Sequence, residues 1–389
     1  MKNLYQGDRG ILVSYMQLAL KRAGYPLLVD GIFGTNTCRA LADFLQTDRT
    51  PDRICVVDRS VWEKLLPYLR GYATEEGENR ILFEDPVTSV EVPYTSLLTA
   101  AVIDGLLARY PFLKSGEIGK SVMGKPISYL EIGNGEKEVF YNASFHANES
   151  ITTPVLLKFA EEYAQAYEKG TTLYGVPAAE LFEEYRLFLV PLVNPDGVDL
   201  VNGLHTDGGY YRRAQQIASD YPAIPFPSGW KANIEGIDLN LQFPAGWENA
   251  KRIKYAQGYT KPAPRDYVGE APLTAPESEA VYAFTRSHDF RLILAYHTQG
   301  EVIYWKYLDY EPAHSYEIAQ YFGRVSGYTV EETPTQSGYA GYKDWFIQEY
   351  DRPGYTIEAG MGENPLPMSD FAGIYRDNAG ILLGGMTQI

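Results

Sequence analysis

Cysteine is scarce in this chain of 389 residues, which has only Cys38 and Cys55. Neither belongs to a CxxC pair. The two thiols could pair in an exported protein, but the N-terminal sequence lacks the long apolar core and small-residue cleavage site of a secretory signal. We therefore expect two reduced, partly buried thiols and a cytoplasmic location.

Positive charge and long apolar runs are also in short supply. The chain has 34 Lys and Arg against 50 Asp and Glu, a formal net charge of −16. This balance argues against nucleic acid or an anionic membrane surface as a partner, and an anionic substrate would depend on a few local cations. No apolar run approaches the roughly 20 residues that span a bilayer. The hydrophobic fraction of 45% predicts a globular protein with a substantial core, in one large domain or two.

Histidine is rare too, and two of the five histidines follow predicted strands. The segment YNASFHANES, residues 141–150, places His146 and Glu149 after an apolar, β-prone run and before a predicted helix over 153–167. Imidazole and carboxylate are ligands that zinc favours. A His-x-x-Glu pair alone is weak, because it arises often by chance.

His297 is the third candidate ligand, since it follows the apolar strand predicted over 291–296. Ligands gather at the carboxyl ends of strands in such sheets. The remaining histidines lie in a Gly/Asp-rich loop, before a strand and at a polar helix start, where surface or capping roles are expected; they are His205, His288 and His314.

Glu358 is the carboxylate we expect to act in proton transfer. It follows a short strand predicted over 355–357 and precedes Gly360, so it can project into a cleft. A water activated by zinc needs a nearby base. Considered alone, Glu358 would be read as an ordinary residue at a strand end.

The fold class follows from strands that alternate with helices after residue 93. Strands are predicted over 127–132, 139–145, 185–192 and 291–296, with a helix over 97–110. This alternation predicts an α/β domain over 93–389 with a largely parallel or mixed sheet. Residues 71–92 are acidic and poorly periodic, so we expect a linker with one short strand docked on the larger domain.

Residues 1–70 form a separate helical pattern with three predicted helices. It resembles the peptidoglycan-binding domain of bacterial wall hydrolases, although Arg59 stands where that family often has a second Gly. The resemblance rests on Gly7, Gly10, Val13, Gln17, Leu20, Gly24, Tyr25, Asp30, Gly31, Phe33, Gly34, Thr37, Phe44, Gln46 and Trp62.

The larger domain resembles the zinc carboxypeptidase family, in which two His and one Glu hold a catalytic zinc. The motifs that carry the resemblance run in family order: His146-x-x-Glu149, Asn194-Pro195-Asp196-Gly197, Gly236-Ile237-Asp238-Leu239-Asn240, His297, Asp344-Trp345 and Thr356-Ile357-Glu358. The resemblance implies a mixed eight-stranded sheet between helices, one Zn²⁺ per chain and Glu358 as general base. It also implies that Lys231 stands where the family places an arginine that stabilises the oxyanion; lysine has the charge without the planar fork.

Two departures from the family indicate the substrate. Carboxypeptidases bind the terminal carboxylate of the substrate with arginines, and here Leu241 and Asn148 occupy those positions. The sequences DLNLQFPAGW, HANES and YHTQGEVIYW resemble the branch of γ-D-glutamyl-meso-diaminopimelate peptidases. Both domains thus imply peptidoglycan or muropeptides as the partner.

We further expect Asn148, Asn240 and a mobile tyrosine on the substrate side of the site. Tyr339 and Tyr342 both fit that tyrosine, and Tyr339 is favoured. In the family, the residue before the Asp-Trp pair selects the incoming side chain. Here it is Lys343, which suits the extra carboxylate of diaminopimelate. The alternative is that Lys343 pairs with a local carboxylate, in which case Arg212 and Arg213 are the next candidates.

Three functions remain open at this point. The first is the wall-peptide endopeptidase, acting in the cytoplasm or on spore or cell wall after lysis. The second is a peptidase or small-amide deacylase with another substrate, which would not need a wall-binding domain. The third is an inactive wall-binding scaffold, which the presence of all three ligands and Glu358 disfavours.

Overall fold

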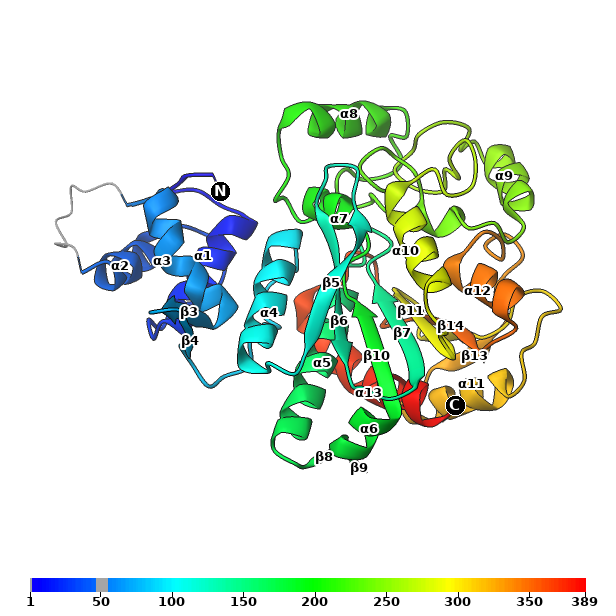
Figure 1. Cartoon of the computed structure of the whole chain (residues 1–389). Helices are drawn as coiled ribbons and strands as arrows, with labels where there is room; N and C mark the ends of the chain where they lie inside the picture. The colour runs from blue at the N-terminus through cyan, green and yellow to red at the C-terminus, as the bar shows by residue number, and fades with distance from the viewer. Residues whose placement is uncertain (1, 47–54) are drawn as a thin grey trace.

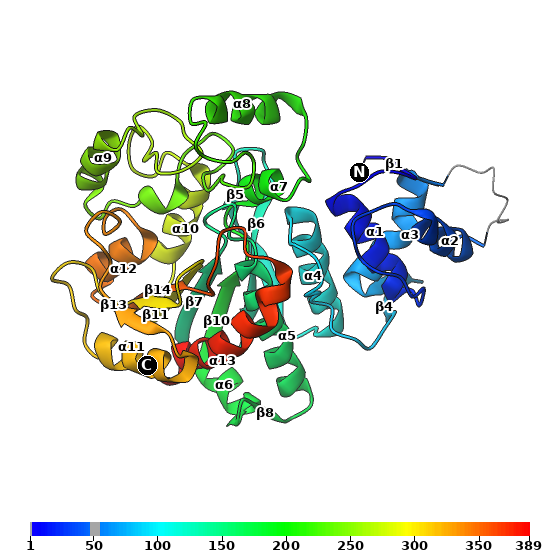
Figure 2. The ribbon, with the colours of Figure 1, turned by 180° about the vertical axis from the view of Figure 1, so that it is seen from behind.

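The computed structural model describes residues 2–46 and 55–389. An eight-stranded mixed sheet lies between layers of helices, and a smaller helical unit made by the N-terminal residues packs beside it (Figures 1 and 2). The α/β fold expected from the alternating pattern is therefore confirmed. Within the described residues, no helix is both long and apolar enough to cross a membrane.

The sheet has the strand order β13-β12-β14-β11-β7-β10-β6-β5. Its central strands β14, β11, β7 and β10 run parallel to one another. The pairs β5–β6, β6–β10 and β12–β14 are antiparallel, and the edge strand β13 runs parallel to β12. The bounds are β5 Lys114–Lys120, β6 Pro126–Ile132, β7 Lys137–Ala143, β10 Tyr185–Val190, β11 Leu292–His297, β12 Val302–Tyr304, β13 Thr329–Glu331 and β14 Gly354–Glu358.

Both faces of the central strands are buried, as the near-continuous apolar sequence of a parallel strand requires. In β7, Val139 and Tyr141 belong to the core on one face, and Phe140 packs into the core on the other. The helices that cover the faces and edges are α4 Ser96–Arg109, α5 Thr152–Glu168, α6 Ala178–Glu184, α7 Pro195–Val201, α8 Gly208–Ser219, α9 Trp247–Ala256, α10 Pro276–Arg286, α11 Ser315–Ser326, α12 Tyr342–Tyr350 and α13 Phe371–Thr387. Shorter elements are η1 Leu239–Leu241, η2 Met368–Asp370, β8 Thr172–Leu173 and β9 Val176–Pro177.

The N-terminal unit contains the three helices expected from the sequence. They are α1 Ile11–Arg22, α2 Thr35–Phe44 and α3 Arg59–Arg70, with a small sheet of β1 Leu4–Tyr5 and β2 Val56–Val57. The buried amide of Gln17 forms hydrogen bonds with several other residues of the sequence pattern. It accepts the backbone N–H groups of Asp30 and Gly31 and donates to Asp30 Oδ1 and Thr37 Oγ1. One satisfied amide thus holds the DG-x-FG loop against two helices.

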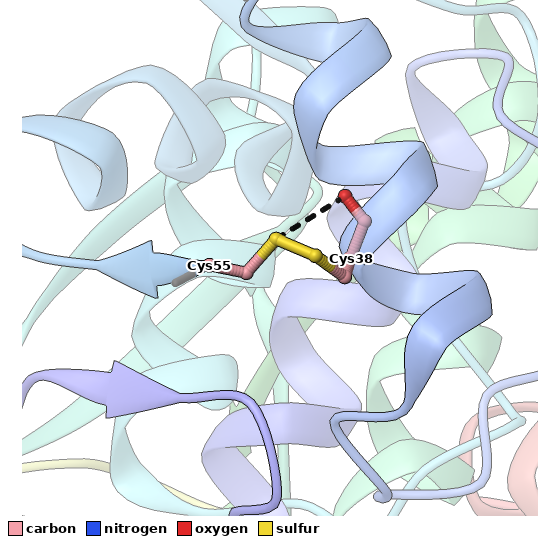
Figure 3. Close-up of a disulfide and its surroundings, with 2 residues drawn as sticks. All are labelled: Cys38 and Cys55. Carbon is pink, nitrogen blue, oxygen red and sulfur yellow. Dashed lines mark hydrogen bonds between the residues drawn. A yellow bond between two sulfur atoms is a disulfide. The ribbon is translucent and has the colours of Figure 1, made fainter. Parts of the chain in front are cut away.

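The two cysteines are bonded to each other, which corrects the expectation of reduced thiols. Cys38 on α2 and Cys55 before β2 form a disulfide with a Cα–Cα distance of 5.8 Å (Figure 3). The sequence pattern could not show that α2 and the start of β2 lie side by side. The bond closes the segment that contains residues 47–54, which lie outside the described residues.

The segment after α3 also differs from expectation. Two short strands, β3 Tyr72–Glu75 and β4 Glu78–Ile81, pair as a hairpin where one strand was expected, and β4 contacts α4 of the larger domain. The chain that follows is held from both sides. Arg22 donates to Val87 O at 2.6 Å from the N-terminal unit, and Glu161 of α5 accepts the N–H groups of Val87 and Thr88. Residues 82–93 are therefore a clamped connection, held by hydrogen bonds from both parts of the protein.

The N-terminal unit is docked directly on α4. Tyr15 of α1 donates its hydroxyl to Pro93 O at 2.9 Å, and one hydrophobic core runs from the N-terminal helices into the sheet. Gly105 of α4 shows how closely the two parts approach, because a Cβ atom there would lie 2.0 Å from Arg70 O at the end of α3. Only glycine permits this contact between the helices. The relative position of the two parts is thus set by packing.

Candidate active site

The candidate ligands converge at the carboxyl ends of three adjacent parallel strands. His297 is the last residue of β11, and it lies beside Glu358, the last residue of β14. His146 and Glu149 follow β7, which pairs with the other side of β11. Because the ends of parallel strands meet at one sheet edge, residues far apart in sequence reach a common point.

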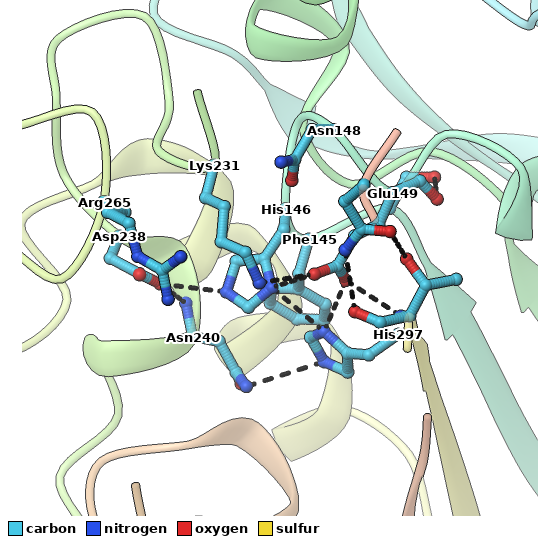
Figure 4. Close-up of polar contacts among 12 residues, drawn as sticks. Phe145, His146, Asn148, Glu149, Lys231, Asp238, Asn240, Arg265 and His297 are labelled. Carbon is cyan, nitrogen blue, oxygen red and sulfur yellow. Dashed lines mark hydrogen bonds and ion pairs between the residues drawn. The ribbon is translucent and has the colours of Figure 1, made fainter. Parts of the chain in front are cut away.

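His146, Glu149 and His297 fit a zinc ion. Their ligand atoms lie within 4.8 Å of one another, and no other such group of three His, Cys, Asp or Glu occurs among the described residues. The two Nδ1 atoms are 3.2 Å apart, and the carboxylate oxygens of Glu149 lie 2.9 Å from His146 Nδ1 and 3.0 Å from His297 Nδ1 (Figure 4). Tetrahedral zinc with bonds of about 2.0–2.1 Å separates its ligand atoms by about 3.3 Å. The donor set and its spacing therefore match zinc, as the sequence predicted.

The loop that carries His146 and Glu149 is fixed by its neighbours. Asn194 caps α7 and donates to Phe145 O and Ala232 O, and Ala147 N donates to Lys231 O at 2.9 Å. Gly197 is required here, since a Cβ atom would lie 2.7 Å from Ala232 O and 2.8 Å from Ala147 Cβ. The Asn-Pro-Asp-Gly motif thus supports the ligand loop from behind.

Asp238 orients His146 from the far side of the imidazole. Its Oδ1 lies 3.1 Å from His146 Nε2, and its Oδ2 accepts the backbone N–H of Asp266 at 3.0 Å. A carboxylate on the outer nitrogen fixes the ring tautomer and makes Nδ1 a better ligand. The GIDLN motif was recognised in the sequence, but this role of Asp238 was not predicted.

The electrostatics of the centre are dominated by buried carboxylates. Burial lowers the pKa of His146, but Glu149 and Asp238 outweigh it and raise the pKa to about 9. Burial raises the pKa of Glu358, and Glu149 adds to the rise, although His297 and Lys231 oppose it. Several buried acids so close together favour a bound cation, and a divalent metal ion supplies that charge.

Glu358 and Lys231 stand together in the cleft. Both line a cavity of about 200 Å³ toward α12 and a second cavity of about 530 Å³ on the other side. Lys231 donates to Glu149 Oε1 at 2.8 Å, so its ammonium is directly beside the metal ligands. The two residues predicted to be catalytic therefore lie where the two cavities meet.

The predicted substrate-side residues are distributed unevenly. Asn240, Leu241 and Lys343 line the smaller cavity, and Asn148 lines the larger one with its Oδ1 buried and without a partner among the described residues. Asn240 also accepts the N–H of Tyr342 at 3.0 Å, which holds the start of α12. Tyr342 is fully buried and contacts Thr285, so it is no candidate for a mobile tyrosine.

Three predicted contacts lie outside both cavities. Tyr339 packs beside Tyr307 and against Gly246 and lines neither cavity. Arg212 and Arg213 are exposed on α8 and line neither cavity. The structure therefore gives these residues no contact with the cleft.

Lys343 is already engaged inside the protein. Its ammonium lies 2.6 Å from Asp344 Oδ1 and donates to Lys306 O at 2.7 Å and to Thr333 Oγ1 at 3.0 Å. An ammonium has three donors. A substrate carboxylate would have to displace one of these partners.

Two cleft residues were missed in the sequence. Tyr304 at the end of β12 and Arg265 in the loop before Tyr267 each line both cavities. Tyr304 lies within the recognised segment YHTQGEVIYW, but no role was predicted for it, and a single Arg in PAPRDY gives no local signal. Of the other histidines, His288 pairs with Glu138 and His314 occupies the N-cap position of α11, as expected for surface or capping roles.

The chain belongs to the zinc carboxypeptidase family, whose sequence profile matches residues 99–379. It is therefore a metallopeptidase that uses zinc. Over 285 residues it is 48% identical to γ-D-glutamyl-L-diamino acid endopeptidase 1 of Lysinibacillus sphaericus, covering 73% of this chain and 70% of that protein. It is also 44% identical to the uncharacterized protein YqgT of Bacillus subtilis (strain 168), covering 70% of this chain and 72% of the relative.

Solved structures show the same fold at low sequence identity. Thrombin-activatable fibrinolysis inhibitor superposes with a TM-score of 0.61 at 17% identity, over 78% of this chain and 77% of that chain. Carboxypeptidase A from Helicoverpa armigera superposes with a TM-score of 0.57 at 19% identity, over 90% of this chain and 94% of that chain. These likenesses support the fold of the larger domain.

We predict that Asp238→Asn weakens zinc binding by about 10- to 100-fold. The amide keeps the shape but loses the charge that favours His146 as a ligand, and it cannot accept hydrogen bonds at both ends. Competition with a chromophoric chelator measures the affinity, with Asp377→Asn on α13 as the control. Unchanged zinc affinity in Asp238→Asn would show that this carboxylate does not orient the ligand.

Proposed function

We propose that this metallopeptidase hydrolyses the γ-D-glutamyl-meso-diaminopimelate amide of bacterial stem peptides. The observation that carries the proposal is the complete zinc-ligand set beside Glu358 in a chain 48% identical to a γ-D-glutamyl-L-diamino acid endopeptidase. Leu241 supports it as well. It lines the smaller cavity and cannot bind a terminal carboxylate, so the cleft does not require a chain end there.

The residues around the cleft divide the chemistry among them. Zinc held by His146, Glu149 and His297 would supply Lewis-acid polarisation of the scissile carbonyl and a lower pKa for the attacking water. Glu358 accepts the proton of that water and later donates it to the leaving amine nitrogen. The Lys231 ammonium stabilises the negative charge that develops on the carbonyl oxygen. Asp238 keeps His146 in place throughout.

We predict that Glu358→Gln keeps its zinc and loses at least about a thousandfold in kcat. Glutamine preserves the shape of the side chain but cannot accept the proton of the water. Mass spectrometry of L-Ala-γ-D-Glu-meso-diaminopimelate follows the reaction, and the wild type should release L-Ala-γ-D-Glu and free diaminopimelate.

Glu349→Gln on α12, outside both cavities, is the matched control and should retain wild-type activity. Turnover near the wild-type rate in Glu358→Gln would mean that another group is the base. Cleavage of a different bond by the wild type would instead favour a peptidase or deacylase of another specificity.

We still propose that Lys343 binds the side-chain carboxylate of diaminopimelate. Its position in the smaller cavity supports this, and its three internal partners oppose it. We predict that γ-D-Glu-meso-diaminopimelate is cleaved at least about tenfold faster than γ-D-Glu-L-Lys, since a charged hydrogen bond is lost with lysine. Lys343→Met should reduce this ratio by slowing the diaminopimelate substrate, and an unchanged kcat/KM ratio would reject the role.

We also propose that residues 1–70 bind peptidoglycan and that residues 93–389 cut it. The ordered motif around Gln17 and the DG-x-FG loop supports the first part. A chain that begins at residue 82 should sediment less with insoluble wall and still cleave the soluble tripeptide. Because its α4 surface would be uncovered, thermal unfolding must first show that it is folded. Equal sedimentation of both chains would contradict a targeting role.

The compartment is part of the same proposal. Disulfides persist in oxidising surroundings and are rare in the cytosol. The Cys38–Cys55 bond therefore favours action on the wall outside the reducing cytoplasm over the cytoplasmic location expected from the sequence. Thiol labelling of the protein in intact cells distinguishes the two, since free thiols would favour the cytoplasm.

A further inference from the structure

Arg265 and Lys231 are the two cations that line both cavities, and the terminal nitrogens of Arg265 have no hydrogen-bond partner among the described residues. Its Nε donates to Asp266 Oδ2 at 2.6 Å. No hydrogen bond joins either terminal nitrogen to any residue in the described ranges 2–46 and 55–389. A guanidinium has five N–H donors in a fixed fork, so four of them remain free. About two fifths of the side chain is exposed, at 42%.

The backbone around Arg265 is held on both sides. Pro264 O accepts the N–H groups of Lys231 and Ala232 at 2.8 and 2.9 Å, and Asp266 N donates to Asp238 Oδ2 at 3.0 Å. Figure 4 shows Arg265 beside Asp238 and its neighbour His146. The backbone of Arg265 is thus held by the same carboxylate, Asp238, that orients the zinc ligand His146. A backbone held in this way reduces the entropy lost when a ligand binds.

The carboxylate that pairs with Arg265 is shared with a second cation. Asp266 is shared by two cations, because Lys254 Nζ also lies 2.6 Å from its Oδ1. The other cleft cations are matched one to one, Lys231 by Glu149 and Lys343 by Asp344. Within the group of Lys254, Arg265 and Asp266, two cations thus share one carboxylate, and the planar terminal donors of Arg265 remain available to a ligand.

A planar fork with parallel donors is suited to bidentate binding of a carboxylate. Since Arg265 lines both cavities beside Glu358, a carboxylate bound there lies near the scissile amide. A γ-D-glutamyl-diamino acid bond has two such groups, the free α-carboxylate of the glutamyl residue and the α-carboxylate of the diamino acid. Ordinary α-peptides have no charge at the first of these positions.

We propose that Arg265 is a specificity-determining residue that binds a substrate carboxylate flanking the scissile amide. The proposal rests on the proposed function for its substrate. It adds a recognition residue to which neither the sequence motifs nor the family resemblance assigns a role. Arg265 acts on binding and positioning of the substrate, while proton transfer stays with Glu358.

The test uses three peptides: L-Ala-γ-D-Glu-meso-diaminopimelate, the same peptide with the glutamyl α-carboxylate amidated, and the same peptide with the diamino acid α-carboxylate amidated. We expect the wild type to disfavour one amidated peptide at least about tenfold in kcat/KM. In Arg265→Met this preference should fall to within about twofold, because only the carboxylate peptide loses an interaction. The peptide whose preference disappears identifies the carboxylate that Arg265 binds. Arg265→Lys, which keeps the charge without the fork, should be intermediate.

Arg376→Met on α13, paired with Asp377 at the surface, is the matched control and should keep the full preference. Zinc content and melting temperature must match the wild type, which separates substrate binding from an effect through Asp238 and His146. A preference that persists in Arg265→Met, a wild type that accepts all three peptides equally, or an equal loss on all three would each overturn the proposal.

A second readout separates this proposal from the proposed function. Calorimetry measures binding of the three peptides to Glu358→Gln, with and without Arg265→Met, so no turnover is needed. Selective loss of carboxylate binding in the double variant supports Arg265. If the wild type cleaves none of the peptides, the proposed function fails, and the role of Arg265 is decided by the binding data alone.

Discussion

The structure of the site depends on one buried charge, the carboxylate of Glu149. Its side chain is 1% exposed and lies among His146, His297 and Lys231. A carboxylate removed from water is strongly destabilising unless positive charge and hydrogen bonds surround it. The three sheet strands, the Asn194 cap and the peptide of Lys231 all serve to hold those partners within reach. Zinc binding completes this compensation, so cofactor and fold stabilise each other.

Asp238 is a second buried carboxylate that needs partners, and it lies one step further from the metal site than Glu149. It is an acceptor for His146 on one oxygen and for the backbone of Asp266 on the other. The loop that ends at Asp266 is therefore positioned by the zinc site, and this loop carries Arg265. Ligand orientation and substrate recognition share one hydrogen-bonded framework. A substitution at Arg265 can therefore alter zinc binding through Asp238 and His146. Measurements of substrate specificity for such variants need the zinc content beside them.

The residues that sequence reasoning found and missed differ in a physical way. His146, Glu149, His297 and Glu358 follow apolar strands, and the geometry of parallel strands brings such positions together. The mixed sheet was predictable for the same reason, although short edge strands such as β12 and β13 were not. Arg265 lies in a loop without periodicity, and its position depends on contacts with distant residues. The Cys38–Cys55 bond and the partners of Lys343 also depend on tertiary packing, which no local pattern reports.

The docking of the N-terminal unit on α4 has a consequence for the proposed hydrolysis of peptidoglycan. A flexibly tethered binding domain lets its partner search a sphere, and the effective concentration then depends on tether length. Here the contact between Gly105 and Arg70 and the clamped residues 82–93 fix the N-terminal unit relative to the larger domain. The cleft therefore lies at one distance and one orientation from that unit. On the proposal that residues 1–70 bind peptidoglycan, only stem peptides at that offset from the anchoring point would enter the cleft. Such an enzyme would advance along the wall by letting go and rebinding, so weak anchoring would serve it better than tight anchoring.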